Sequence, residues 1–71
     1  MFNVICLNKQ NGHIMFFQRD LKGYRQVHNP FQASRYTEKE ADTLVQEYTE
    51  FLKKTQPACW DRYCVAKVKL G

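Results

Sequence analysis

The feature that most constrains this chain is a helix start encoded in residues 33–41. Thr37 is a favourable N-cap because its hydroxyl can accept a hydrogen bond from an unpaired amide of the first turn. Glu40, three residues later, can return a bond to the Thr37 amide and complete a capping box. Apolar residues then recur at helical spacing, which predicts one amphipathic helix over about residues 38–53. The stripe that this helix is expected to bury consists of Ala41, Leu44, Val45, Tyr48, Phe51 and Leu52.

The segments on either side of this helix have the composition of strands. Residues 2–7 are rich in strand formers, and Asn11-Gly12 is a strong hairpin signal that leads into a returning strand at 13–18. A turn is expected at 19–23, and residues 24–28 form either a third short strand or an irregular excursion before Asn29-Pro30. Pro57 marks the end of the helix, and residues 60–70 are expected to form the last strand.

This order, β-β-(β)-α-β, predicts an α+β fold in which the helix packs on one face of a small antiparallel sheet. The 71 residues make one domain, residues 1–71. Alternation along each strand predicts which side chains face the helix, although a shift of one residue would exchange the two faces. The expected helix-facing residues are Val4, Cys6, Ile14, Phe16, Cys64, Ala66 and Val68.

The three cysteines argue against a complete disulfide framework because their number is odd. Reduced, buried thiols are the expected state, since a free cysteine behaves as a small hydrophobe. The alternative is a zinc site made by Cys6, Cys59, Cys64 and either His13 or His28, but this spacing lacks the close ligand pairs of structural zinc sites. No motif indicates a nucleophile, a metal or a cofactor. We therefore expect no catalytic residue, no cofactor and no enzymatic activity.

The apolar N-terminal segment lacks the basic leader and the small-residue cleavage site of a signal peptide. No run approaches the roughly 20 apolar residues that span a membrane. A cytoplasmic location and no membrane partner are the resulting expectations, with a monomer or a weak homodimer as the expected oligomeric state.

The net charge of +4 is distributed unevenly along the chain. Residues 1–36 contribute +4, residues 37–56 contribute −2 and residues 57–71 contribute +2. Basic and aromatic side chains on the sheet are therefore expected to form one face, which suits an acidic protein patch or, alternatively, phosphates and stacked bases. In a simpler interpretation the aromatic rings cover one another and the strand lysines deter aggregation. The candidate partner-binding residues are Phe17, Arg19, Lys22, Tyr24, Arg25, Phe31, Arg35, Trp60, Tyr63, Lys67 and Lys69.

The chain resembles very small phage-encoded proteins, including anti-CRISPR inhibitors, built from a hairpin, one helix and a closing strand. The matching segments are Gly23-Tyr24, residues 33–41 and residues 65–70. These motifs cap and pack, so the resemblance implies a fold and a phage origin. It further implies a non-enzymatic accessory protein in the host cytoplasm. Such a protein would bind and inhibit a host or defence protein through its sheet face and the 19–35 loop.

A second resemblance implies the alternative function. Residues 12–20 and 22–25, followed by a Glu-Ala helix, look like the small arm-binding domains of phage integrases. Those domains place a three-stranded sheet in the DNA major groove, which implies a nucleic-acid-binding module that uses the basic-aromatic sheet face. The strand expected at 63–70 departs from that pattern because it would add to the sheet and change its geometry.

Overall fold

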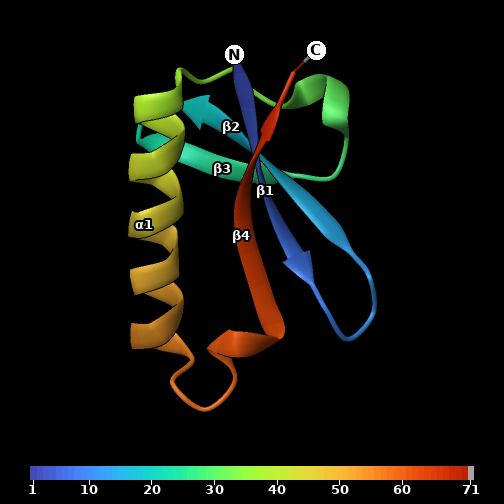
Figure 1. The fold of residues 1–71 in the computed structure, drawn as a ribbon, viewed down its shortest axis with the longest axis vertical. Coiled ribbons are helices and arrows are strands. Elements are labelled where there is room, and N and C mark those ends of the chain that lie inside the picture. The colour runs from blue at the N-terminus through green and yellow to red at the C-terminus, as the bar shows by residue number, and fades with distance from the viewer. Residues whose placement is uncertain (71) are drawn as a thin grey trace.

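The computed structural model describes residues 1–70, in which one helix packs against one four-stranded antiparallel sheet (Figure 1). The strands are β1 (Phe2–Asn8), β2 (Ile14–Asp20), β3 (Gly23–Val27) and β4 (Tyr63–Lys69), in the order β3-β2-β1-β4. The helix is α1 (Glu38–Thr55), and two short 3-10 turns are η1 (Pro30–Gln32) and η2 (Trp60–Arg62). The predicted α+β class is confirmed, and the third segment is a strand. Within the described residues, no helix is long and apolar enough to cross a membrane.

The start of α1 is the capping box that the sequence predicts. The Glu40 amide donates to Thr37 Oγ1 at 3.2 Å, and Glu40 Oε1 accepts from the Thr37 amide at 2.9 Å. Lys53 and Lys54 occupy the last turn, where cations interact favourably with the helix dipole. The helix therefore begins at the expected residue and runs two residues beyond the expected end.

The apolar stripe of α1 packs on the sheet with one exception. Phe51, expected in the core, is 52% exposed, and that expectation is wrong. Its ring stays at the margin of the stripe, 5.6 Å from the ring centroid of Tyr48. The other stripe residues are buried (Ala41, Leu44 and Leu52) or packed against the core while partly exposed (Val45 and Tyr48).

The face that each strand turns toward α1 is predicted correctly for β1 and wrongly for β2 and β4. Val4 and Cys6 of β1 are buried beneath the helix, as expected. In β2, residues 14–17 are all apolar, so an alternating pattern cannot indicate which side of the strand faces the helix. The structure places the odd-numbered residues of β2 toward α1. The corrected helix-facing set in these two strands is Met15, Phe17, Tyr63 and Val65, in place of Ile14, Phe16, Cys64, Ala66 and Val68.

The error in β4 has a specific cause in Lys67. Its position alternates with apolar residues, which suggests a solvent-facing side. Its ammonium instead lies 2.7 Å from Asp42 Oδ1 and 3.3 Å from Glu38 Oε2, both at the start of α1. The nitrogen also lies 5.4 Å from the centroid of the Phe2 ring. A long lysine side chain can lie along apolar surface while its charged end reaches a polar partner, so Lys67 occupies the helix-covered face.

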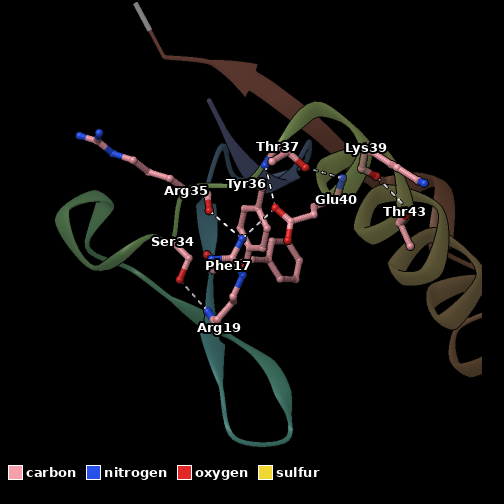
Figure 2. Close-up of polar contacts among 9 residues, drawn as sticks. All are labelled: Phe17, Arg19, Ser34, Arg35, Tyr36, Thr37, Lys39, Glu40 and Thr43. Carbon is pink, nitrogen blue, oxygen red and sulfur yellow. Dashed lines mark hydrogen bonds and ion pairs between the residues drawn. The ribbon is translucent and has the colours of Figure 1, made fainter.

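A short segment before α1 extends the sheet where two strands separate. β1 and β2 pair only between residues 5–7 and 14–16, and beyond this point Tyr36 forms a bridge with Phe2. The two residues exchange backbone hydrogen bonds of 2.8 Å each. On the other side, the Ser34 amide donates to the Phe17 carbonyl at 3.1 Å, and Ser34 Oγ accepts from the Arg19 amide at 2.7 Å (Figure 2). The loop from β3 to α1 is thus fixed at its C-terminal end.

Replacing the N-cap tests the capping box. Thr37→Ala should lower the free energy of unfolding by about 1 kcal/mol, because one first-turn amide loses its acceptor. Urea denaturation followed by circular dichroism measures the change. Thr43→Ala is the matched control, since Thr43 lies within the helix and bonds only to the Lys39 carbonyl (3.0 Å). Equal losses for the two variants would contradict the capping role.

The carboxylate of Glu40 should make stability depend on pH. Bonds from the Thr37 amide and hydroxyl, with a smaller effect of the Arg19 guanidinium, lower the pKa of this carboxyl from its ordinary value. A lowered pKa stabilises the fold above the ordinary value, and this contribution is lost as the pH falls through the value in the folded protein. The difference in unfolding free energy between wild type and Glu40→Gln should therefore be largest at neutral pH. It should shrink in acid, and a difference that stays constant from neutral to acidic pH would contradict this role of Glu40.

Candidate partner-binding surface

The sheet face opposite α1, here called the open face, is mostly apolar, and its polar strand residues are Asn3, Gln18, Asp20 and Arg25. Figure 1 shows α1 on one side of the sheet and no helix of comparable length on the other. The register aligns Val27, Phe16, Ile5 and Ala66 in one row across all four strands. The apolar residues of the open face are Ile5, Leu7, Ile14, Phe16, Val27, Cys64, Ala66 and Val68.

Exposure varies across this face, and Ile5, Leu7, Phe16 and Ala66 are half-buried. Ile14 and Val68 are each 43% exposed, while Val27 is 8% exposed. Val27 precedes the loop that carries η1, and η1 contacts β2 on the side of the sheet away from α1 (Figure 1). The loop thus borders one end of the open face and leaves most of it uncovered.

Phe31 is held in solvent by the η1 turn. Its side chain is 94% exposed, which is unusual for a residue of this size. Asn29 caps the turn, since its Oδ1 accepts from the Phe31 amide at 2.9 Å, and Pro30 sets the backbone at the first position. The Ala33 amide closes the turn on the Pro30 carbonyl at 3.2 Å. Phe31, a candidate binding residue from the sequence, is therefore an aromatic side chain exposed to solvent on an ordered turn.

The basic-aromatic face expected from the sequence does not form as one exposed surface. Phe17 is fully buried and unavailable to a partner, so its assignment as a binding residue is wrong. Tyr24 and Tyr63 are partly buried on the same helix-covered face. The Phe17 ring packs edge-on against Tyr24 at 5.4 Å and against Tyr48 at 5.0 Å. The simpler interpretation, in which these rings cover one another, describes the packing of Phe17 with Tyr24.

Two of the candidate cations are bound by carboxylates of α1. Arg19 Nη2 lies 3.1 Å from Glu40 Oε1 and 2.9 Å from the Arg35 carbonyl, and its guanidinium lies over the Tyr36 ring (Figure 2). Lys67 is held by two carboxylates as described above, and its hydrogen bond with Asp42 is the main cause that raises the pKa of its ammonium group. These cations contribute to joining the helix to the sheet.

The remaining candidates lie at the borders of the open face or away from it. Within the described strands, Arg25 is the one basic residue on the open face, where its Nε donates to Gln18 Oε1 at 2.8 Å, and Asp20 of β2 lies on the same face. Arg35 extends away from the other labelled side chains in Figure 2. Trp60 is half-buried with Lys53 Nζ 4.8 Å from its ring centroid. Lys22 in the β2–β3 turn and Lys69 near the end of β4 are exposed.

The distribution of charge differs between the two layers. The helix together with its two bound cations is neutral, with five cations and five carboxylates. The rest of the sheet and the loops carry the whole net charge of +4. The cations of this second group are Lys9, Lys22, Arg25, Arg35, Arg62 and Lys69, and its carboxylates are Asp20 and Asp61.

The thiols occupy different environments. Cys6 is buried on the helix-covered face, whereas Cys64 is exposed on the open face, so the two cannot join in the zinc site considered above. Cys59 is half-buried and its Sγ donates to Gln56 Oε1 at 3.4 Å. Among residues 1–70, no cluster of three histidine, cysteine or acidic side chains is placed to hold a metal ion.

The aliphatic residues of the open face were missed as binding residues because the sequence assigned several of them to the core. The sequence does contain one indication of an apolar open face, the four adjacent apolar residues of β2. Such a run places apolar side chains on both faces of a strand. No protein-family model, curated protein or solved structure matches the chain. The geometry of this surface is therefore the basis on which a function is inferred.

Thiol labelling tests the assignment of faces. We expect Cys64 to react first with a thiol reagent in the native protein and Cys6 to react last, because burial raises the pKa of the Cys6 thiol and blocks access. Cys64→Ser should remove the fastest phase in stopped-flow measurements, and Cys6→Ser should leave it intact. Rapid labelling of Cys6 would contradict the register.

Proposed function

We propose that this chain is a non-enzymatic, phage-type accessory protein that binds and inhibits a host or defence protein. The open face and the η1 loop form its binding surface. The observation that supports this proposal most directly is the pairing of an uncovered apolar sheet face with Phe31, an aromatic side chain that is 94% exposed. Contiguous exposed apolar surface on a small protein marks an interaction site, and aromatic anchors dominate binding energy.

The charge of this side indicates the chemistry of the partner. The sheet and loops hold six cations against two carboxylates, while the helix layer is neutral. An acidic protein surface would complement these cations and speed the encounter. A second copy of the chain would add a second net charge of +4, so charge favours a different protein as the partner.

The aliphatic character of the open face favours protein over nucleic acid. Sheets that bind single strands offer aromatic platforms and a basic groove. Here Phe16 is the one aromatic strand residue on the open face and Arg25 the one cation, within the described strands. Arg19 and Lys67, which a nucleic-acid surface would need, are bound to α1 carboxylates. Nucleic-acid binding thus has less support.

The fixed loop adds to the proposal because a preformed surface loses less entropy on binding. Tyr36 bridges to β1, the Asn29 side chain caps η1, and Val27 ends β3. Phe31 is therefore presented between anchored ends. A side chain held in its binding conformation keeps more of its contact energy as affinity.

Replacing the exposed aromatic residue tests the proposed surface. Phe31→Ala should weaken partner binding at least tenfold, as expected for an aromatic anchor, while the melting temperature stays nearly constant. The matched control is Phe51→Ala, which removes an exposed phenylalanine (52%) from the helix side. Tagged variants would be compared in nuclease-treated host lysate, and captured proteins quantified by mass spectrometry. Equal capture by the Phe31 variant and wild type would contradict the proposal.

A charge placed on the open face gives a second, independent test. Ile14→Glu should abolish capture of the same protein, because burying an unpaired carboxylate in an apolar interface is costly. Salt separates the two partner classes. Contacts to several phosphates would reduce affinity by orders of magnitude between about 50 and 200 mM salt, and nuclease treatment would remove the captured material. These two results together would contradict a protein partner and indicate that the partner is nucleic acid.

A further inference from the structure

A cavity lies on the helix-covered side of the sheet, apart from the open face. Its volume is about 340 Å³, near the lower end of the range of small-molecule sites, roughly 300 to 1,000 Å³. It is lined by side chains of four stretches of the chain: β1 with the β1–β2 loop and the start of β2, then β3, the C-terminal half of α1 with Gln56, and β4. Cys6 and Leu52, 5% and 2% exposed, contribute apolar lining beside Met15. Four separate parts of the chain thus meet around one hollow.

Among the described residues, the cavity is lined by polar groups but by no lysine, arginine, aspartate or glutamate, and its one imidazole is that of His13, an exposed residue of the β1–β2 loop. This is notable in a chain in which 25% of the residues are charged. Four side-chain amides, from Asn8, Asn11, Gln26 and Gln56, line the cavity together with His13 and the Tyr48 and Tyr63 side chains. A cation would lose its hydration there without gaining a carboxylate, and an anion would find no lysine or arginine, so an uncharged polar ligand fits better.

Hydrogen bonds fix which end of each amide remains available. Backbone N–H groups can only donate, so the bonds from the Gln10 and His13 amides orient Asn8 Oδ1 and Asn11 Oδ1 toward the protein, at 3.0 and 2.9 Å. Gln56 Oε1 accepts from the Cys59 thiol. Within residues 1–70 the NH₂ groups of these three amides donate no hydrogen bond to the protein, so we assign them to a ligand. The cavity therefore offers mainly donors, which suits a ligand rich in carbonyl acceptors.

Gln26 supplies a complementary acceptor. Its Nε2 donates to the Tyr48 hydroxyl, which leaves Gln26 Oε1 for a ligand N–H group. Tyr48 accepts this bond and keeps its own proton to donate, and burial raises the pKa of its phenol, so the hydroxyl stays protonated. Tyr48 and Tyr63 add two aromatic rings to the lining, which favours a planar ligand.

We propose that this cavity binds a small, uncharged, planar heterocycle of the pyrimidine-dione class, of which uracil is the simplest probe. Two carbonyl oxygens of such a ring match the amide donors, and a ring N–H matches the Gln26 carbonyl. The site uses none of the residues of the open face, so this inference goes beyond the proposed protein binding and stands or fails separately from it.

Titration of the ¹⁵N-labelled protein with uracil, followed by ¹H–¹⁵N NMR, tests the site. Saturable shifts are expected at the side-chain amides of Asn8, Asn11 and Gln56. Orotate, which adds a carboxylate to the same ring, and ribose, which is neutral but not planar, should each bind at least about tenfold more weakly. No saturable shift with uracil, or equal binding of the three probes, would overturn the proposal.

Isosteric variants link binding to the named groups. Gln56→Glu keeps the side-chain size and an oxygen for the Cys59 thiol but removes the amide donor, and it should raise the Kd for uracil at least about tenfold. Gln46→Glu, on the exposed part of α1, is the matched control and should leave the Kd unchanged. Tyr63→Phe removes a hydroxyl while keeping the ring and should also weaken binding. Wild-type affinity in both folded cavity variants would refute the assignment.

Discussion

The carboxylate of Glu40 is the contact on which the arrangement of helix and sheet depends. One of its oxygens accepts from the Thr37 amide and lies 3.1 Å from the Arg19 guanidinium. The same Arg19 donates to the Arg35 carbonyl and covers the Tyr36 ring. Through its pair with Glu40, the Arg19 side chain thus joins the end of β2 to the first turn of α1 and to the segment that bridges to β1. Because α1 is the only long helix in the described chain, these contacts fix the start of the one helix that covers the sheet.

The covering of one face has a direct consequence for the other. A single helix packs against one side of a four-stranded sheet, so the opposite side stays in solvent. In many antiparallel sheets that side is polar, whereas here it holds aliphatic residues in every strand. Leaving such a surface uncovered in a chain of 71 residues sacrifices hydrophobic burial. A partner that buries this surface would restore the lost stabilisation, which is the physical basis of the proposed function.

Local signals in the sequence predict the helix and three of the strands, leave the third segment (β3) open, and are insufficient to predict which face of each strand meets the helix. Thr37 and Glu40 predict the helix start because a capping box is a local arrangement. The register of β2 and β4 depends on contacts between distant residues, and Lys67 illustrates the difficulty. Its attachment to Glu38 and Asp42, more than 20 residues away in sequence, places an apparently solvent-facing lysine on the helix side. Phe17 was therefore assigned to a binding surface although it forms the centre of the core.

The sequence predicts only part of the candidate surface, because the rest depends on contacts between residues that are distant in the sequence. Phe31 follows Asn29-Pro30, and an apolar residue in such a loop either folds under the domain or remains exposed. Only the structure distinguishes these outcomes, because the exposure of Phe31 depends on how Ser34 and Tyr36 attach the loop to β2 and β1. Arg25 was recognised as a basic strand residue, but its place beside aliphatic neighbours required the register of β3 with β2.

The two proposed sites use opposite sides of the sheet and different physical forces. On the open face, aliphatic area and peripheral cations favour a large acidic protein, whose affinity would come mainly from burial around Phe31. In the cavity, oriented amides in a volume of about 340 Å³ favour a small neutral molecule held by directional hydrogen bonds. β1 separates them, since Cys6 lines the cavity while Ile5 and Leu7 belong to the open face. A ligand under the helix would therefore affect the protein partner only by changing the position or rigidity of this central strand, since it shares no side chain with the partner's surface.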